Sequence, residues 1–266
     1  AVSGGVNLAA AGSRISRSTI DTTTTVSYAA LALGRNTLAE STTVRRSGGS
    51  GVYIGGGLSD TARIRALTIL GSVGVGLQAE AAKVLADSAS ILINGNAYAF
   101  RGYVDNFAAV ARDSLSQLKL LGNTQDLAVI VGNSGRPFRG RPGRLDTLRV
   151  IPQLPWQVTN DVYIDTLARL LPSPGARVGF WSGSMHFAAG GRLISRGTFA
   201  APVFFEKYSA TSGQFYGLRF LNAGGSAMDT SVIVNTVVHT IESCQSGSLT
   251  CSALAPYDRH VLLIDS

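Results

Sequence analysis

The chain has 266 residues, of which 45% are apolar and only 15% are charged, so it has enough apolar material for a buried core and wholesale disorder is excluded. The formal net charge is +7, and Arg carries nearly all of the positive charge, because the only lysines are Lys83, Lys119 and Lys207. This balance favours polyanionic partners and a weakly charged surface that other copies of the chain cover. No apolar run reaches the ~20 residues of a membrane span, and we expect no signal peptide at the start.

The N-terminal stretch, residues 1–57, is rich in Gly, Ser and Thr. Such a segment lacks the apolar density to fold alone, so we predict an extended arm that orders only against its neighbours. Residues 23–33 and 41–44 within it have β-prone composition. The main globular domain is then expected to cover residues 58–266.

Helical signals begin after this arm. Ser59 and Asp60 form an N-cap signal, and Ile64, Leu67 and Leu70 follow at helical spacing. We therefore predict a helical segment across residues 59–122.

Within this segment a second helical stretch is expected at 77–89, followed by a strand and turn at 90–100. Residues 104–121 form an amphipathic pattern that ends at Gly122, as a helix with a C-terminal glycine does.

The second half of the chain has the composition of a β protein. Residues 127–131 predict a short buried strand, and residues 132–144 form a Gly/Pro/Arg loop that is a candidate sub-boundary. A short helix is expected at 161–171. Five β-prone runs separated by turn residues follow Pro174, and they predict an antiparallel sandwich. No fixed-period repeat is visible, and the predicted fold class is α+β.

The densest basic cluster lies in and just after the loop. Its members are Arg136, Arg139, Arg141, Arg144 and Arg149. The core Arg139-Gly140-Arg141-Pro142 is similar to an AT-hook, in which Arg-Gly-Arg lies along the minor groove. We predict that these arginines bind nucleic acid non-specifically through phosphate. A solvated Arg/Gly loop, or an ion-paired contact between subunits, is the alternative.

A second basic set has the same ambiguity. It consists of Arg14, Arg17, Arg45 and Arg46, all in the predicted arm.

Two motifs suggest enzyme chemistry but are incomplete. Gly74–Ala79 matches the dinucleotide pattern G-x-G-x-x-A, although Asn94 and Asn96 stand where an acidic residue is expected. Gly132–Pro137 is similar to the surroundings of a chymotrypsin-like serine nucleophile. That fold supplies its histidine base earlier in the chain, and here all three histidines follow Ser134.

The C-terminal region contains residue types that bind zinc, namely His239, Cys244, Cys251 and His260. Their spacing fits no compact zinc knuckle, and a disulfide or a pair of thiols is the alternative. Glu206 and Glu242 lie in strand-like runs, where a glycosidase pair occurs, but nothing fixes their separation. We predict no catalytic residue, no metal site and no cofactor.

One segment resembles a known family. Phe180-Trp181-Ser182-Gly183-Ser184-Met185-His186-Phe187 is similar to the F-x-W-R-G-S-M-x-(Y/F) strand of picorna-like viral capsid proteins, with Ser182 in place of the family Arg. Gly191–Leu193 is similar to a later G-R-L of that family. The resemblance covers residues 145–245 and implies an eight-stranded jelly roll.

Three functions remain open. The first is a structural capsid or coat subunit in a virion, which self-assembles with copies of itself or sister subunits and contacts packaged nucleic acid through Arg. The second is a secreted β-rich enzyme or toxin, whose site assembles only in three dimensions. The third is a nucleotide-binding enzyme built on Gly74–Ala79.

Overall fold

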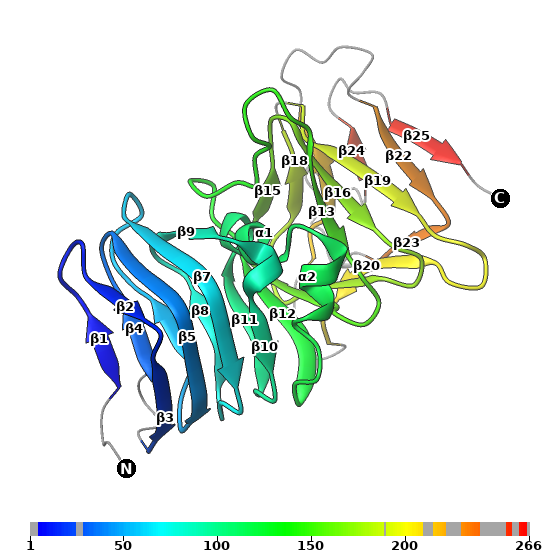
Figure 1. Ribbon diagram of the computed structural model, residues 1–266. Helices are drawn as coiled ribbons and strands as arrows, with labels where there is room; N and C mark the ends of the chain where they lie inside the picture. The colour runs from blue at the N-terminus through cyan, green and yellow to red at the C-terminus, as the bar shows by residue number, and fades with distance from the viewer. Residues whose placement is uncertain are drawn as a thin grey trace. The chain divides into compact units, whose positions relative to one another are not determined.

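The computed structural model describes residues 5–24, 29–188, 190–209, 215–221, 230–239, 254–256 and 261–264. The chain divides into two compact units, residues 1–128 and 129–266. Each unit is a β-solenoid, in which successive turns of the chain stack strand on strand in parallel sheets (Figure 1).

The first unit has two parallel sheets. Sheet 1 follows the order β1 (Val6–Leu8), β4 (Leu31–Leu33), β6 (Val52–Ile54), β8 (Val75–Ala79) and β11 (Tyr98–Tyr103). In sheet 2 the strands are β2 (Arg14–Ser16), β3 (Thr19–Thr23), β5 (Thr37–Ser47), β7 (Thr61–Leu70), β9 (Lys83–Ala86) and β10 (Leu92–Asn94). The long strands β5 and β7 pair with each other, β5 also pairs with β2 and β3, and β7 also pairs with β9 and β10.

The second unit has three parallel sheets. Sheet 3 contains β14 (Trp156–Thr159), β17 (Arg177–Phe180), β20 (Val203–Lys207) and β23 (Thr236–Val238). Sheet 4 contains β13 (Asp146–Val150), β16 (Ala168–Pro172), β19 (Arg192–Arg196), β22 (Ser231–Val234) and β25 (Val261–Ile264). Sheet 5 contains β15 (Val162–Ile164), β18 (Met185–Phe187), β21 (Leu218–Phe220) and β24 (Leu254–Pro256). One further strand, β12 (Gln125–Val131), crosses the boundary between the units.

The length of a turn can be followed in the register of the sheets. In the first unit Val52 pairs with Leu77, 25 positions later, and Leu77 with Phe100, 23 positions later. In the second unit the step grows from Val162–Met185, 23 positions, to Met185–Leu218, 33 positions. The repeat is therefore structural but not strictly periodic, which explains why no fixed period is visible in the sequence.

Apolar side chains fill the interior of each unit. In the first, Ile64, Ile69, Leu77 and Phe100 are fully buried. In the second, Phe187 and Phe220 pair in register and their rings stack with centroids 5.1 Å apart. Since neighbouring turns place side chains of one kind above each other, each turn buries its apolar face only against the next.

Buried asparagines satisfy backbone groups at one corner of the first unit. The Asn96 side chain accepts a hydrogen bond from the Ser72 N–H at 2.8 Å, and the Asn123 side chain accepts one from the Asn96 N–H at 3.0 Å. Asn96 is fully buried, so these bonds prevent the cost of unpaired polar groups.

Two short helices lie beside sheet 2. They are α1 (Val104–Ala111) and α2 (Ser114–Leu118), and a single 3-10 turn, η1 (Ser88–Ser90), precedes them in the chain. On α1, Asn106 accepts a hydrogen bond from the Val84 N–H and donates to the carbonyls of Ala79 and Ala82. The helix thereby covers the backbone of β9, which would otherwise be a bare sheet edge.

The predicted fold class is wrong. The second half is not an antiparallel sandwich or jelly roll, because its strands pair in parallel. The described part of residues 1–57 is not an extended arm but the first turns of the solenoid. The predicted strand at 127–131 is confirmed as part of β12.

The predicted helices at 59–89 and 161–171 are wrong, and the first error has a clear physical origin. In β7 the buried residues are Ala62, Ile64, Leu67 and Ile69, because Ala66 adopts a left-handed conformation with φ of 50° and shifts the alternation by one residue. The resulting step of three between Ile64 and Leu67 imitates helical spacing. Residues 161–171 form β15 and β16 instead of a helix, and within 104–121 only α1 and α2 are helical.

The segment that resembles the capsid strand is a corner between two sheets. Phe180 ends β17, Gly183 turns the chain with φ of 92°, and Met185–Phe187 forms β18. β17 and β18 pair in parallel with strands of neighbouring turns, so the jelly roll that the resemblance implied is not present.

Candidate polyanion-binding face

Sheet 2 is bent along a column of left-handed residues. Arg17, Ser41 and Ala66 have φ of 49°, 48° and 50° and occupy the same register in successive turns. Left-handed backbone at a non-glycine residue costs free energy, so its repetition marks a position that the fold requires. Before this column, the sheet consists of β2, the first halves of β5 and β7, and β9; we call this part the first leg.

Cations gather on the outer side of the first leg. Arg63 and Arg65 alternate with the buried Ala62 and Ile64, so both point away from the core. The full set is Arg14, Arg17 (in the left-handed column), Arg63, Arg65 and Lys83, with Glu40 and Asp87 as carboxylates. Asp87 directly follows β9, where its N–H donates to the Ile64 carbonyl, so it lies in register with Arg65. We call these side chains the basic face. Five cations and two carboxylates give it a formal charge of +3, out of +7 for the whole chain.

The register spreads these cations over neighbouring strands. Arg14 pairs with Leu38, and Leu38 with Arg63, so the two arginines lie two strands apart. At the usual strand spacing this is ~9.6 Å, and Arg63 and Arg65 lie ~6.6 Å apart along β7. The sheet therefore holds the cations on a fixed grid.

Only part of this charge is neutralised within the molecule. Arg14 forms an ion pair with Glu40, and Arg65 Nη1 lies 3.9 Å from the other oxygen of the same carboxylate. Arg17, Arg63 and Lys83 are exposed, and within the described ranges none of them has an ion-pair partner. These three side chains are available to an anion.

The rest of sheet 2, beyond the column, consists of β3, the second halves of β5 and β7, and β10; we call it the second leg. Its surface charge is closer to neutral. Arg46 donates two hydrogen bonds to Asp21, at 2.8 and 2.6 Å, and Arg45 lies 3.3 Å from the same carboxylate. The hydrogen bonds from Arg46 lower the pKa of Asp21 to about 2. The predicted basic set of Arg14, Arg17, Arg45 and Arg46 is thus divided between the two legs.

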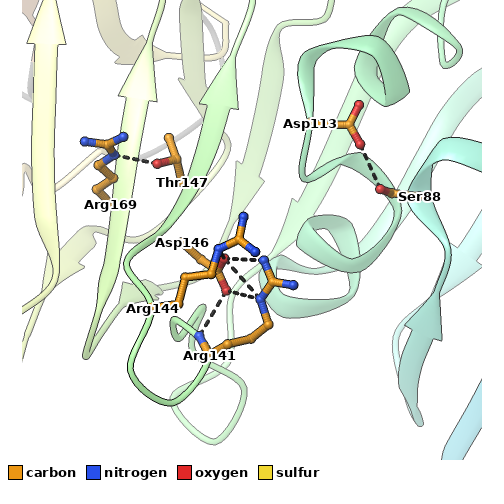
Figure 2. A network of polar contacts seen from close by, with 7 residues as sticks. All are labelled: Ser88, Asp113, Arg141, Arg144, Asp146, Thr147 and Arg169. Carbon is orange, nitrogen blue, oxygen red and sulfur yellow. Dashed lines mark hydrogen bonds and ion pairs between the residues drawn. The ribbon is translucent and has the colours of Figure 1, made fainter.

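The predicted nucleic-acid site has a different geometry. We call residues 132–149 the arginine loop. Arg141 binds both oxygens of Asp146 through its side chain, at 2.9 and 2.7 Å, and its backbone N–H donates to the same carboxylate at 3.0 Å (Figure 2). Arg144 lies 3.6 Å from Asp146, whose side chain is only 2% exposed. Asp146 raises the pKa of Arg141 through these hydrogen bonds.

The remaining arginines of the predicted site differ in their surroundings. Arg139 donates to Asp165 at 2.9 Å, Arg136 is buried at 6% exposure, and Arg149 lies on β13 with its side chain exposed. Arg139, Arg141 and Arg144 are ion-paired within the chain, an arrangement that was not predicted from the sequence.

Figure 2 also shows two further polar contacts. Arg169 on β16 donates to the hydroxyl of Thr147 on β13 at 2.5 Å, which links neighbouring strands of sheet 4. Ser88 donates to Asp113, the N-cap residue of α2, at 2.9 Å.

The other sequence motifs do not assemble sites in the described residues. Gly74–Ala79 lies in and before β8, and a strand offers no helix N-terminus for a pyrophosphate. Gly76 is needed for packing, since a Cβ there would lie 2.3 Å from Ile93 Cγ2. Ser134 is exposed in a turn where Gly135 N–H donates to the Asn133 side chain.

The predicted zinc and carboxylate residues are largely beyond what the structure describes. Cys244, Cys251, His260 and Glu242 lie outside the described residues, and His239 is exposed at the end of sheet 3. Glu206 forms an ion pair with Arg177 at 2.5 Å. Within the described part of the chain, no group of three or more His, Cys, Asp and Glu side chains is arranged to hold a metal ion.

Sequence reasoning missed the basic face because its members are far apart in the chain. Arg63, Arg65 and Lys83 fell within predicted helices. The signal that was present is the R-I-R pattern at 63–65, which alternates with period two as a half-exposed strand does.

Neither helix in the described ranges has the length and apolar character to cross a bilayer.

Comparison with known proteins finds no relative. No family model, no curated protein and no solved structure matches the chain.

Proposed function

We propose that the protein is a structural β-solenoid whose basic face binds the phosphate backbone of duplex nucleic acid by charge, without reading its sequence. The observation that carries the proposal is the grid of five cations with only two carboxylates among them; Arg17, Arg63 and Lys83 have no internal ion pair in the described ranges. Four of the five cations are arginines, and the guanidinium fork matches the geometry of a phosphate.

The composition of the face favours a duplex over a single strand. No outward side chain of the first leg is aromatic, so bases have no surface on which to stack. The paired bases of a duplex need no such surface, because their phosphates alone face the protein. The first leg itself consists of strands, so it offers no helix to the major groove, which supports contact without sequence readout.

The viral-coat expectation loses the support that the family resemblance gave it. That resemblance implied a jelly-roll fold, and the chain is a parallel solenoid. Non-specific contact with nucleic acid does not depend on that fold. We assign this contact to the basic face instead of the arginine loop.

The test is a binding titration with a fluorescently labelled duplex DNA, followed by anisotropy at several salt concentrations. If three phosphates are neutralised, the logarithm of the association constant falls against that of the salt concentration with a slope of about −3. The double variant Arg63→Glu/Lys83→Glu should weaken binding by at least about tenfold. Arg196→Glu, which reverses an exposed arginine on β19, is the matched control and should change affinity much less.

Two results would contradict the proposal. If Arg139→Ala/Arg149→Ala weakens binding more than the double variant of the basic face, the site lies on the arginine loop. If a sulfated polysaccharide such as heparin binds more tightly than the duplex at equal salt, and does so through the same residues, the partner is a polysaccharide and not nucleic acid.

A further inference from the structure

Two exposed aromatic side chains lie next to each other in the second unit. Trp181 follows β17 and Tyr208 follows β20, and the register of sheet 3 places them at equivalent positions of successive turns. Their ring centroids are 6.3 Å apart with planes inclined at 52°, and the residues are 46% and 40% exposed. We call Trp181, Tyr208, Asn160, Asp161 and Ser182 the aromatic corner.

Polar groups border this aromatic pair. Ser182, the neighbour of Trp181 in the chain, accepts a hydrogen bond from the Asn160 N–H at 3.0 Å. The Asp161 carboxylate accepts one from the Ser184 N–H at 2.7 Å, and its side chain remains 46% exposed. The His186 imidazole, whose Nε2 lies 3.6 Å from the carboxylate, and the hydrogen bond from the Ser184 N–H lower the pKa of Asp161, so it is an ionised acceptor at neutral pH.

The aromatic corner is held rigidly by the solenoid. The Trp181 N–H donates to the Val158 carbonyl at 2.7 Å, and the Tyr208 N–H donates to the Phe180 carbonyl at 2.9 Å. Gly179 allows Tyr208 to lie close over β17, since a Cβ there would be 3.0 Å from Tyr208 Cδ2. Beneath the surface, Phe180 and Phe215 are fully buried and stack at 4.0 Å.

A rigid pair of exposed aromatic rings bordered by acceptors fits a sugar ring. A pyranose has a face of C–H groups that packs on an aromatic ring and a rim of hydroxyls that donate to carboxylate and amide oxygens. Trp and Tyr supply contact area at low entropic cost, and because their surroundings fix them, little freedom is lost on binding. The corner contributes one carboxylate, and Arg219 lies near enough to lower the pKa of that Asp161 side chain, so the local charge is balanced and suits a neutral sugar.

We propose that the aromatic corner is a binding site for a neutral oligosaccharide, with one pyranose ring packed on Trp181 and Tyr208 and hydroxyls bound by Asp161 and Asn160. The site is independent of the basic face, because its residues lie in the other unit and its interaction is not ionic. Sugar binding is therefore insensitive to salt, whereas binding of a polyanion is not.

The experiment is isothermal titration calorimetry with a panel of neutral oligosaccharides. The panel contains β-1,4-, α-1,4- and β-1,3-linked glucose hexamers, a mannan hexamer and a galactan hexamer. At least one member should bind, with the same affinity at 0.05 and 0.5 M salt. Since Trp156 is buried and Trp181 is the only other tryptophan of the chain, binding should also shift tryptophan emission to the blue.

Variants locate the site. Trp181→Ala should weaken binding by about tenfold or more, and Asp161→Asn, which keeps the acceptor for Ser184, by about threefold. Phe199→Ala is the control, because Phe199 is 93% exposed on a separate turn and should have no effect on affinity. Circular dichroism of each variant establishes that the fold is retained.

Three outcomes overturn the proposal: no member of the panel binds, Phe199→Ala weakens binding as much as Trp181→Ala, or the Trp181→Ala variant instead abolishes self-association on a sizing column while the wild type binds no sugar. The last outcome would identify the corner as a contact between copies of the chain. Loss of duplex binding by the basic-face variant, with sugar binding unchanged, separates the two proposals.

Discussion

The arginine loop and the basic face contain similar numbers of cations, yet they differ in what those cations face. In the loop, Asp146 and Asp165 bind Arg139, Arg141 and Arg144, and one of these carboxylates is buried. On the basic face the partly exposed Glu40 serves two arginines, and three cations have no ion pair in the described ranges. Density along the sequence therefore measures available charge poorly, because neighbours in the chain also bring their own counterions. Register across strands decides where uncompensated charge collects.

The largest effect should come from removing the carboxylate at the centre of the arginine loop. Asp146→Ala should lower the free energy of unfolding by about 2 kcal/mol, because Arg141 loses a charge-assisted bidentate contact and its backbone N–H loses an acceptor. Chemical denaturation measures the change. If instead the variant is as stable as the wild type and binds duplex DNA more tightly, the loop arginines bind DNA once the carboxylate is removed. The difference drawn between the arginine loop and the basic face would then be wrong.

A smaller gain should follow from relieving strain on the basic face. The arginine loop has glycine at a left-handed position, Gly143 with φ of 72°, whereas the first leg of sheet 2 has Ala66 with φ of 50°. Ala66→Gly should stabilise the protein by up to about 1 kcal/mol, because glycine adopts this conformation without the steric cost. The melting temperature should rise. A fall would mean that the greater entropy of the unfolded glycine chain outweighs the strain.

The same left-handed residues explain how much of the fold could be predicted from the sequence. The strand at 127–131 was predicted correctly, since a short apolar run between turn residues needs no periodicity. In β5 and β7, however, Ser41 and Ala66 change the side on which later residues point, so apolar residues recur at steps of two and three. A local pattern of this kind cannot be distinguished from a helix until the neighbouring turn supplies its hydrogen bonds.

The candidate site was hidden for a related reason. Arg17, Arg63 and Lys83 lie on three different turns, and only the register of sheet 2 brings them to one surface. The arginine loop was visible because its members are close in sequence. The five runs after Pro174 were recognised as β-structure, but a list of strands does not determine whether they pair in parallel, so the predicted topology was wrong.

Removing the ion-pairing carboxylate of the basic face, Glu40, should increase affinity for duplex DNA modestly. Glu40→Ala frees Arg14 and Arg65, so affinity for duplex DNA should rise about threefold and the salt dependence should steepen. Stability should change by less than ~0.5 kcal/mol, since exposed ion pairs contribute little. Asp146→Ala should differ, because there the free energy of unfolding falls. Unchanged affinity would show that the phosphates do not approach this part of the sheet.

The smallest effect concerns Asp21 on the second leg. This carboxylate is partly exposed, as Glu40 of the basic face is, and it also contacts two arginines, as Asp146 of the arginine loop does. Its pKa is lowered from 3.8 to about 2, so the contribution of its ionised form to stability is complete above pH 3.8 and is lost as the pH falls toward 2. Carbon-detected NMR of the carboxyl group should give the low value, and Arg46→Ala should return it most of the way to 3.8, because Arg45 alone lies 3.3 Å away and donates no hydrogen bond to Asp21. If Asp21 titrates normally in the wild type, Arg46 is free in solution. The second leg would then add its own cations to the grid of the basic face, and Arg46→Glu would weaken duplex binding as strongly as Arg63→Glu.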